Sequence, residues 1–208
     1  DINKLIISVL PFIPKIIIKH ISNRYIAGTI DEHAINTIKK INEMNLSATL
    51  DILGEHTKDI NEANKITKNY INLYKKISDK NLDCNISIKP SHIGTDINEE
   101  TFYKNLNLIH KEAINRNNFL RIDMENTQLT DITINTFKKN HKVFNNIGIV
   151  IQAYLYRSEK DIDKLNEKMN IRLCKGIYNE KKNKAIKNPD KINENYLYLL
   201  KKAFKKNL

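Results

Sequence analysis

Short apolar segments alternate with longer amphipathic segments along most of the chain. Each short segment is rich in Ile, Val or Leu, and in the stretch that follows apolar residues recur every three or four positions, the spacing of one helix face. This pattern predicts five strands, each followed by a helix. We expect the strands at residues 48–53, 84–89, 119–123, 147–152 and 170–174. We expect helices from Gly28 to about 45, then over about 60–77, 102–113, 131–139, 158–165 and 192–203.

Two of these helices carry residues typical of a helix start. Thr29 and Glu32 have the Ser/Thr-x-x-Glu spacing of a capping box, in which hydroxyl and carboxylate accept hydrogen bonds from unpaired backbone amides. Ser158, with Asp161 three positions later, is expected to cap the helix that follows the fourth strand.

Regular alternation of strands and helices requires parallel strands joined by helical crossovers, and therefore an α/β fold. A doubly wound open sheet and a β/α-barrel (TIM-type) both satisfy this pattern. The first strand–helix turn lacks the G-x-G-x-x-G spacing of dinucleotide-binding sheets. Distinctive polar residues instead follow every strand, which favours a barrel, whose active site is built at the carboxyl ends of several strands. These residues are Asp51, Lys89, Asp123, Gln152 and Lys175.

We therefore expect one domain over residues 1–208. It comprises an N-terminal helical segment, 1–45, and the first five β/α units of a barrel, 46–208. Five units do not close an eight-stranded barrel, which takes about 250 residues. The chain also begins at Asp1 without an initiator Met, so we expect it to be an incomplete or trimmed barrel.

Composition excludes several classes of protein. The formal net charge is +11, but the lysines are spread along helices among acids, so we expect a solvated basic surface and no nucleic-acid binding. Residues 5–18 are apolar, yet they are interrupted by prolines and are shorter than the ~20 residues of a membrane span. Cys84 and Cys174 lie in strand-like segments without metal-binding spacing. We expect reduced core cysteines and a cytoplasmic protein.

The strand ends offer candidate chemistry. Lys89 ends an apolar strand, so its ammonium suits an anionic group such as a substrate carboxylate. The carboxylate of Asp123, one strand further on, is expected to pair with Lys89, although an aspartate that anchors a loop fits the pattern as well. We expect the Arg172 guanidinium to be buried inside the barrel, where it needs a partner; a carboxylate, an electron-rich cofactor atom or a structural ion pair would each serve.

Other strand-end residues suit a bulky planar ligand. The Gln152 amide offers a donor and an acceptor that match the pyrimidine edge of a flavin. Gly176 permits close approach of the backbone to a ligand. Tyr178 combines an apolar ring with a polar tip. The scattered histidines predict no metal site.

Six motifs, taken in order, resemble the proline dehydrogenase family, in particular its short monofunctional bacterial form. The motifs are RYIAG (24–28), ATLDILGE (48–55), SIKPSHIG (87–94), RIDMENT (121–127), IQAYLYR (151–157) and RLCKGIY (172–178). The resemblance extends over about residues 24–203. It implies FAD-dependent oxidation of L-proline to Δ1-pyrroline-5-carboxylate, with electrons passing to a quinone. It also leaves open a peripheral position at the inner face of a membrane.

The resemblance also implies roles for single residues. Lys89 would pair with the proline carboxylate, Asp123 would orient that lysine, and Tyr178 would pack beside the proline ring. Arg172 would stabilise charge that develops on the flavin. The FAD site would be lined by Met124, Gln152, Arg172, Cys174, Lys175 and Gly176.

The chain departs from the family pattern at two positions and at its end. Ile177 replaces the usual Ala and Cys174 the usual Val. The resemblance implies three further strands and a last helix with two arginines that bind the substrate carboxylate, and these do not occur before Leu208. We therefore expect a proline dehydrogenase that is active only in its full-length form. Two alternatives stay open: an inactive barrel fragment that lacks the C-terminal substrate-binding arginines, or a different flavin oxidoreductase on the same barrel.

Overall fold

The structure is a computed structural model that describes residues 26–28 and 31–208. The chain divides into two compact units, Asp1–Ala48 and Thr49–Leu208. In the first unit, helix α3 (Asp31–Glu43) buries Ala34, Ile35 and Ile38. It ends two residues before the expected position, and Asn45 then takes a left-handed φ of 60°. The capping residue Thr29 and the apolar segment 5–18 lie outside the described residues.

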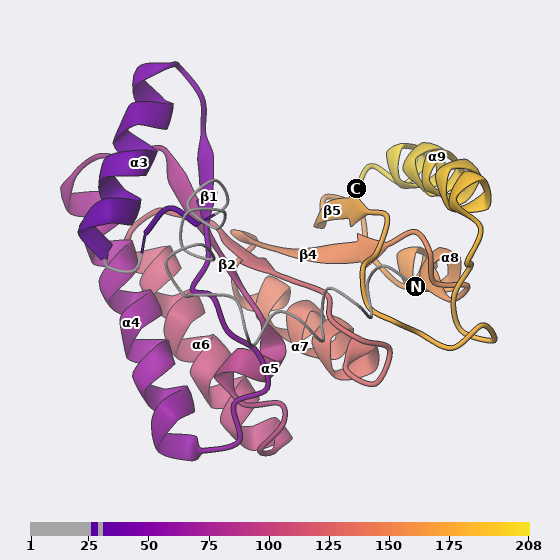
Figure 1. Cartoon of the computed structure of the whole chain (residues 1–208), viewed down its shortest axis with the longest axis horizontal. Coiled ribbons are helices and arrows are strands. Elements are labelled where there is room, and N and C mark those ends of the chain that lie inside the picture. Colours follow the sequence, from indigo (N-terminus) through magenta and orange to yellow (C-terminus); the bar gives the residue numbers. More distant parts are fainter. Residues whose placement is uncertain (1–25, 29–30) are drawn as a thin grey trace, which may run out of the picture. The chain divides into compact units, whose positions relative to one another are not determined.

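The second unit is built around one sheet of five parallel strands (Figure 1). The first strand starts at the boundary between the two units. Its strands are adjacent in their sequence order, β1 to β5. A doubly wound sheet would reverse its strand order at a switch point. The sequential order therefore confirms the β/α-barrel prediction, and the strands form a curled half-barrel. They are β1 (Ala48–Leu50), β2 (Cys84–Ile88), β3 (Leu120–Ile122), β4 (Ile147–Gln152) and β5 (Asn170–Cys174).

Helices alternate with these strands as predicted. α4, α6 and α7 lie along one side of the sheet (Figure 1). Among the described residues, the structure adds one helix that the sequence pattern did not predict, α5, which has four residues and starts with Pro at its first position. The helices are α4 (Ile60–Asp79), α5 (Pro90–Ile93), α6 (Glu99–Asn115), α7 (Thr130–Val143), α8 (Ser158–Asp163) and α9 (Pro189–Lys205).

The prediction that Ser158 caps α8 is wrong. The position before the helix belongs to Arg157, and no side chain caps the helix start. The Ser158 hydroxyl instead donates a 2.5 Å hydrogen bond to the Gln152 carbonyl at the end of β4. Asp161 forms an ion pair with Arg157. Both groups therefore anchor the loop after β4 to the start of α8.

The two faces of the sheet differ in polarity because side chains alternate along each strand. Buried Ile and Leu side chains, such as Ile86, Ile88, Leu120 and Ile122, form the apolar core with the helices. Polar side chains occupy the intervening positions and meet across strands; Thr49 on β1, for example, donates a 2.7 Å hydrogen bond to Asn85 on β2. The usual interior of such a barrel is filled by bulky aliphatic residues. Here many side chains on this face are polar, among them Thr49 and Asn85.

Tyr74 connects α4 to the sheet through a buried ring and a hydrogen bond. Its ring is fully buried, and its hydroxyl donates a 2.9 Å hydrogen bond to the Phe119 carbonyl just before β3. We expect Tyr74→Phe to lower the free energy of unfolding by about 1–2 kcal/mol, because the partly buried carbonyl loses its donor while the ring remains. Urea unfolding measures this change. Tyr103→Phe, at a side chain that is 40% exposed, is the control and should have little effect; equal losses in both variants would contradict the assignment.

Candidate active site at the carboxyl ends of the strands

A cavity of about 560 Å³ opens at the carboxyl ends of the strands. Its volume lies in the range of ligand-binding pockets, about 300–1,000 Å³. The residues that line it come from the ends of β2 to β5 and from the loops after β1 and β5. They are Glu55, Lys89, Asp123, Met124, Val150, Gln152, Arg172, Cys174, Lys175, Gly176, Ile177 and Tyr178.

Every residue selected from the sequence as a catalytic or binding candidate borders this one cavity. Sequence reasoning did not select Glu55 or Val150. Glu55 could have been found, because it follows Gly54 in the loop at the carboxyl end of the first strand. Val150 is an apolar side chain within a uniformly apolar strand, and nothing in the sequence distinguishes it from its neighbours.

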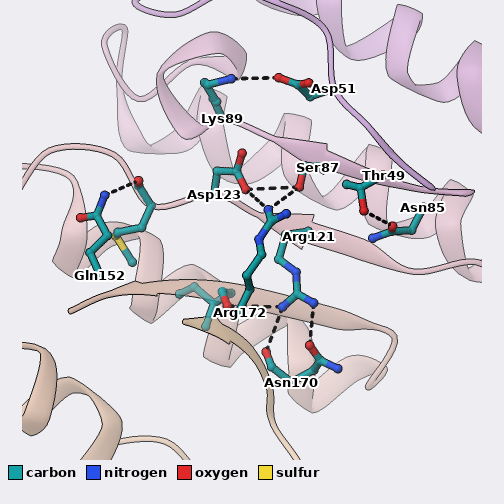
Figure 2. Close-up of polar contacts among 12 residues, drawn as sticks. Thr49, Asp51, Asn85, Ser87, Lys89, Arg121, Asp123, Gln152, Asn170 and Arg172 are labelled. Carbon is teal, nitrogen blue, oxygen red and sulfur yellow. Dashed lines mark hydrogen bonds and ion pairs between the residues drawn. The ribbon is translucent and has the colours of Figure 1, made fainter. Parts of the chain in front are cut away.

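Asp123 and Arg172 form the central ion pair of the cavity (Figure 2). One Nη atom of Arg172 donates to Asp123 Oδ1 at 2.5 Å and to the hydroxyl of Ser87 at 2.8 Å. The Ser87 hydroxyl donates in turn to the same Asp123 oxygen at 3.2 Å. The Arg172 side chain is not buried as the sequence suggested, since it is 42% exposed. Its guanidinium is therefore held from one side and accessible from the cavity.

Lys89 pairs with Asp51 and not, as predicted, with Asp123 (Figure 2). Its ammonium donates to Asp51 Oδ2 at 3.0 Å. Burial alone would lower the pKa of Lys89, whose side chain is only 16% exposed, but the Asp51 hydrogen bond and nearby carboxylates outweigh burial and raise it. The prediction failed because Arg172 takes the Asp123 carboxylate. Lys89 nevertheless stays cationic at the cavity wall.

Gln152 presents an unsatisfied acceptor beside this ion pair. Its Nε2 donates a 2.9 Å hydrogen bond to the Met124 carbonyl, which fixes the orientation of the amide (Figure 2). Its Oε1 is buried and finds no hydrogen-bond partner within the described part of the chain. A buried acceptor without a donor costs about 1–3 kcal/mol, so a ligand N–H would be stabilised at this position.

The loop after β5 shapes the opposite wall. Gly176 has a φ of 106°, and a Cβ there would lie 2.1 Å from the Tyr154 ring, so only glycine fits this turn. The Tyr178 hydroxyl donates a 3.0 Å hydrogen bond to Glu55, which joins the loops after β5 and β1. Burial raises the pKa of Tyr178 well above its usual value, so the phenol stays protonated.

Both cysteines are free thiols, but only one of them belongs to the core. Cys84 is buried, whereas Cys174 is half-buried and lines the cavity, so its prediction as a core residue is wrong. Burial raises the pKa of the Cys174 thiol, which favours its neutral form.

A buried carboxyl joins the loops after β2 and β3 next to the cavity. Glu125 is 0% exposed and accepts hydrogen bonds from the amide and the hydroxyl of Ser91, at 2.7 and 2.6 Å. Burial raises the pKa of Glu125, although the Ser91 hydrogen bonds oppose the shift. A carboxyl whose pKa is raised by folding contributes most stability below its unfolded pKa, about 4.3, and loses it as the pH rises through the folded value.

Replacing Glu125 with Gln should therefore make the free energy of unfolding less sensitive to pH. Relative to the wild type, we expect the Glu125→Gln variant to gain stability as the pH rises from about 4.3 through the folded pKa, and the difference to stay constant at higher pH. Urea unfolding at several pH values measures the difference. Glu99→Gln, at an exposed position in the first turn of α6, serves as the control. A difference between the Glu125 variant and the wild type that does not change with pH would contradict the assignment.

The cavity combines three cations with a donor–acceptor amide and an apolar–aromatic wall. Lys89, Arg172 and Lys175 suit anionic groups, and Gln152 suits the edge of a planar heterocycle. In the described ranges, 26–28 and 31–208, no group of three or more His, Cys, Asp or Glu side chains is placed to hold a metal ion. None of the helices described there is long and apolar enough to cross a membrane.

The chain is similar in sequence to proline dehydrogenases. It is 36% identical over 171 residues to proline dehydrogenase 1 of Bacillus subtilis subsp. natto, which covers 82% of this chain and 56% of that protein. It is 33% identical over 183 residues to proline dehydrogenase 2 of Bacillus subtilis strain 168, with 87% and 60% covered. The chain thus spans 56–60% of the length of these curated relatives.

A solved structure shares the fold. Proline utilization A from Bdellovibrio bacteriovorus, inactivated by N-propargylglycine, superposes with a TM-score of 0.83 at 21% identity. The match covers 92% of this chain and 25% of that one. The model of the proline dehydrogenase family matches residues 34–191, about three quarters of the sequence. By this match, the chain belongs to the proline dehydrogenase family.

Proposed function

We propose that this chain supplies the flavin- and proline-binding part of a FAD-dependent proline dehydrogenase, which oxidises L-proline to Δ1-pyrroline-5-carboxylate. One observation carries the proposal. The side chains that the family resemblance assigns to flavin and substrate come from four strands and their loops, and all of them border a single cavity. Membership of the family and the names of its relatives agree with this reading.

The residues present suit a flavin. The buried Oε1 of Gln152 lacks a donor within the described residues, and the pyrimidine edge of a flavin carries an N–H that could supply one. Arg172 and Lys175 place positive charge beside the same cavity, where they would attract electron-rich ring atoms or phosphates. When bound, the flavin supplies the two-electron acceptor for the reaction.

Lys89 and Tyr178 are proposed to bind proline. The ammonium of Lys89 stays charged beside Asp51 and can pair with the substrate carboxylate. The Tyr178 phenol is tied to Glu55 and so offers a fixed ring face against which the pyrrolidine ring can pack. These two side chains would orient the substrate, and neither would take part in the redox step.

Arg172 is proposed to stabilise the negative charge that would develop on a bound flavin as it accepts hydride from proline. A preorganised cation acts best when it need not reorient during the reaction. Asp123 and Ser87 provide this preorganisation, because they fix the guanidinium on one side and leave the other side open to the cavity. Asp123 is thus proposed to act on Arg172, and not on Lys89 as first expected.

The onward path of the electrons is proposed from the family resemblance alone. We infer a quinone acceptor, reached at a membrane surface on the cytoplasmic side. The formal net charge of +11 would favour contact with anionic lipid headgroups.

The full-length protein that contains this chain, purified and mixed with FAD, tests the proposal. We expect stoichiometric binding of FAD, weakened in a Gln152→Leu variant, which loses both the donor and the acceptor. With a dye as electron acceptor, L-proline should be converted to a product lighter by two hydrogens, detected by mass spectrometry. FAD binding without any conversion of L-proline would favour a different flavin oxidoreductase, and absence of FAD binding would refute the proposal.

A further inference from the structure

A second arginine lies inside the half-barrel, further from the cavity than Arg172. Arg121 on β3 is in register with Gly148 on β4, which is in register with Asn170 on β5. The Arg121 side chain crosses β4 at this level, and its Nη2 donates to Asn170 Oδ1 at 2.7 Å (Figure 2). The crossing depends on Gly148, because a Cβ there would lie 2.4 Å from Arg121 Nη1.

Arg172 crosses the same strand in the opposite direction. It is in register with Val150, two residues beyond Gly148, and reaches from β5 to Asp123 after β3 and to Ser87 on β2. Figure 2 shows the Arg121 and Arg172 side chains side by side, with their guanidinium groups at opposite ends. Two arginines therefore lie next to each other on the inner face of the half-barrel, two residues apart in strand register, with their guanidinium groups pointing in opposite directions.

The groups that accept hydrogen bonds from Arg121 are all neutral among the described residues. In the part of the chain that the structure describes, its hydrogen bonds go to Asn170 and to backbone carbonyls, and its Cζ lies 4.8 Å from the centroid of the Phe119 ring. Burial and the charge of Arg172 together lower the pKa of Arg121 to about 10, although the charge of Asp123 opposes the shift. Both guanidiniums remain cationic at neutral pH and so repel each other.

We propose that Arg121 is a positioning residue for Arg172. Its guanidinium occupies the space beside Asn170 and repels a second cation there, so the Arg172 guanidinium is kept at the level of Asp123, facing the cavity. This inference rests on the proposed function in one respect: positioning Arg172 affects catalysis only if the cavity binds flavin and proline. The placement of Arg172 itself can be measured without flavin or substrate.

A double-mutant cycle measures how strongly Asp123 and Arg172 interact. Asp123→Asn, Arg172→Met and the double variant are unfolded in urea, and the cycle gives the coupling between the two side chains. The cycle is repeated in the Arg121→Met background, which keeps length and loses charge, and in the Arg121→Lys background, which keeps charge. Arg121→Gln replaces Arg121→Met where the apolar variant does not fold.

Arg121→Met or Arg121→Gln should reduce the Asp123–Arg172 coupling by at least half, because Arg172 is then free to turn towards Asn170. Arg121→Lys should restore most of the coupling. A residue that only supports folding would lower overall stability and leave the coupling unchanged. An unchanged coupling in the uncharged variants, or an equal loss in Arg121→Lys, would overturn the proposal.

The rate of flavin reduction provides a second test of the role of Arg121. With FAD bound, Arg121→Met should slow flavin reduction by proline by about tenfold or more, since a small displacement of a catalytic group has effects of this size. The proline concentration for half-maximal rate should change by no more than about twofold, because the proposed carboxylate partner Lys89 is untouched. A wild-type protein that proline does not reduce would refute the proposed function, whereas the coupling measurement still decides the role of Arg121.

Discussion

Replacing Arg172 with Met is expected to slow reduction of the bound flavin by L-proline by about a hundredfold to a thousandfold, the range found when one preorganised electrostatic group is removed. The guanidinium lies at the cavity wall, fixed by Asp123 and Ser87 and open on its other side. Its charge is therefore in place before electrons move, and Met leaves nothing to replace it. Rapid mixing of FAD-loaded protein with proline under anaerobic conditions measures the rate.

Two variants control for other effects at this site. Arg172→Lys keeps the charge but loses the simultaneous contacts to Asp123 and Ser87, so its rate should lie between those of the wild type and the Met variant. Arg116→Met removes an arginine from the end of α6, where it pairs with Glu112 and Asp79, and should leave the rate unchanged. A wild-type rate in Arg172→Met would remove Arg172 from the proposed site.

The second large effect is expected on substrate binding. Lys89→Met should raise the proline concentration for half-maximal flavin reduction by about tenfold to a hundredfold or more, because a charge-assisted hydrogen bond to the carboxylate is lost. FAD affinity should change little, since Lys89 pairs with Asp51 and follows β2, whereas Gln152 ends β4, with β3 between these strands. Asp51 is 45% exposed and can be hydrated once its partner is gone, so the variant should fold.

Titration of proline and of FAD separates the two binding events. Lys104→Met, at an exposed lysine on α6, removes an equal charge away from the cavity and should leave both unaffected. Equal weakening of proline and FAD by Lys89→Met would mean that Lys89 supports the cavity as a whole. Unchanged proline binding would show that the substrate carboxylate lies elsewhere.

The sequence predicted the order of the elements because each unit carries its own periodicity. The bounds of β4 and β5 agree with the prediction, whereas β1 ends at Leu50, three residues early. The chain leaves the sheet after Leu50 although Ile52 and Leu53 are apolar, and the Tyr70 hydroxyl hydrogen-bonds the backbone of Ile52. Helix α5 was missed because four residues show no periodicity, although Pro90 at its start and Gly94 at its end were visible signals.

The location of the site could also be predicted, but its internal pairing could not. Parallel strands bring their carboxyl ends to one edge, so residues such as Lys89, Gln152 and Lys175 were expected near one another. Which acid pairs with which base depends on how far a long side chain crosses the sheet. Arg172 crosses β4 to Asp123, and Lys89 then turns to Asp51. The role of Gly148 in making room for Arg121 likewise emerges only from the register of three strands.

The central claim is that one cavity holds both the flavin and the proline that reduces it. Anaerobic addition of L-proline to the FAD-loaded protein, followed by the absorption band of oxidised flavin, tests it most directly. We predict that the band bleaches with L-proline, far more slowly in Arg172→Met and only at higher proline concentrations in Lys89→Met. A bound flavin that L-proline leaves oxidised, or that bleaches equally in all three proteins, would contradict the account.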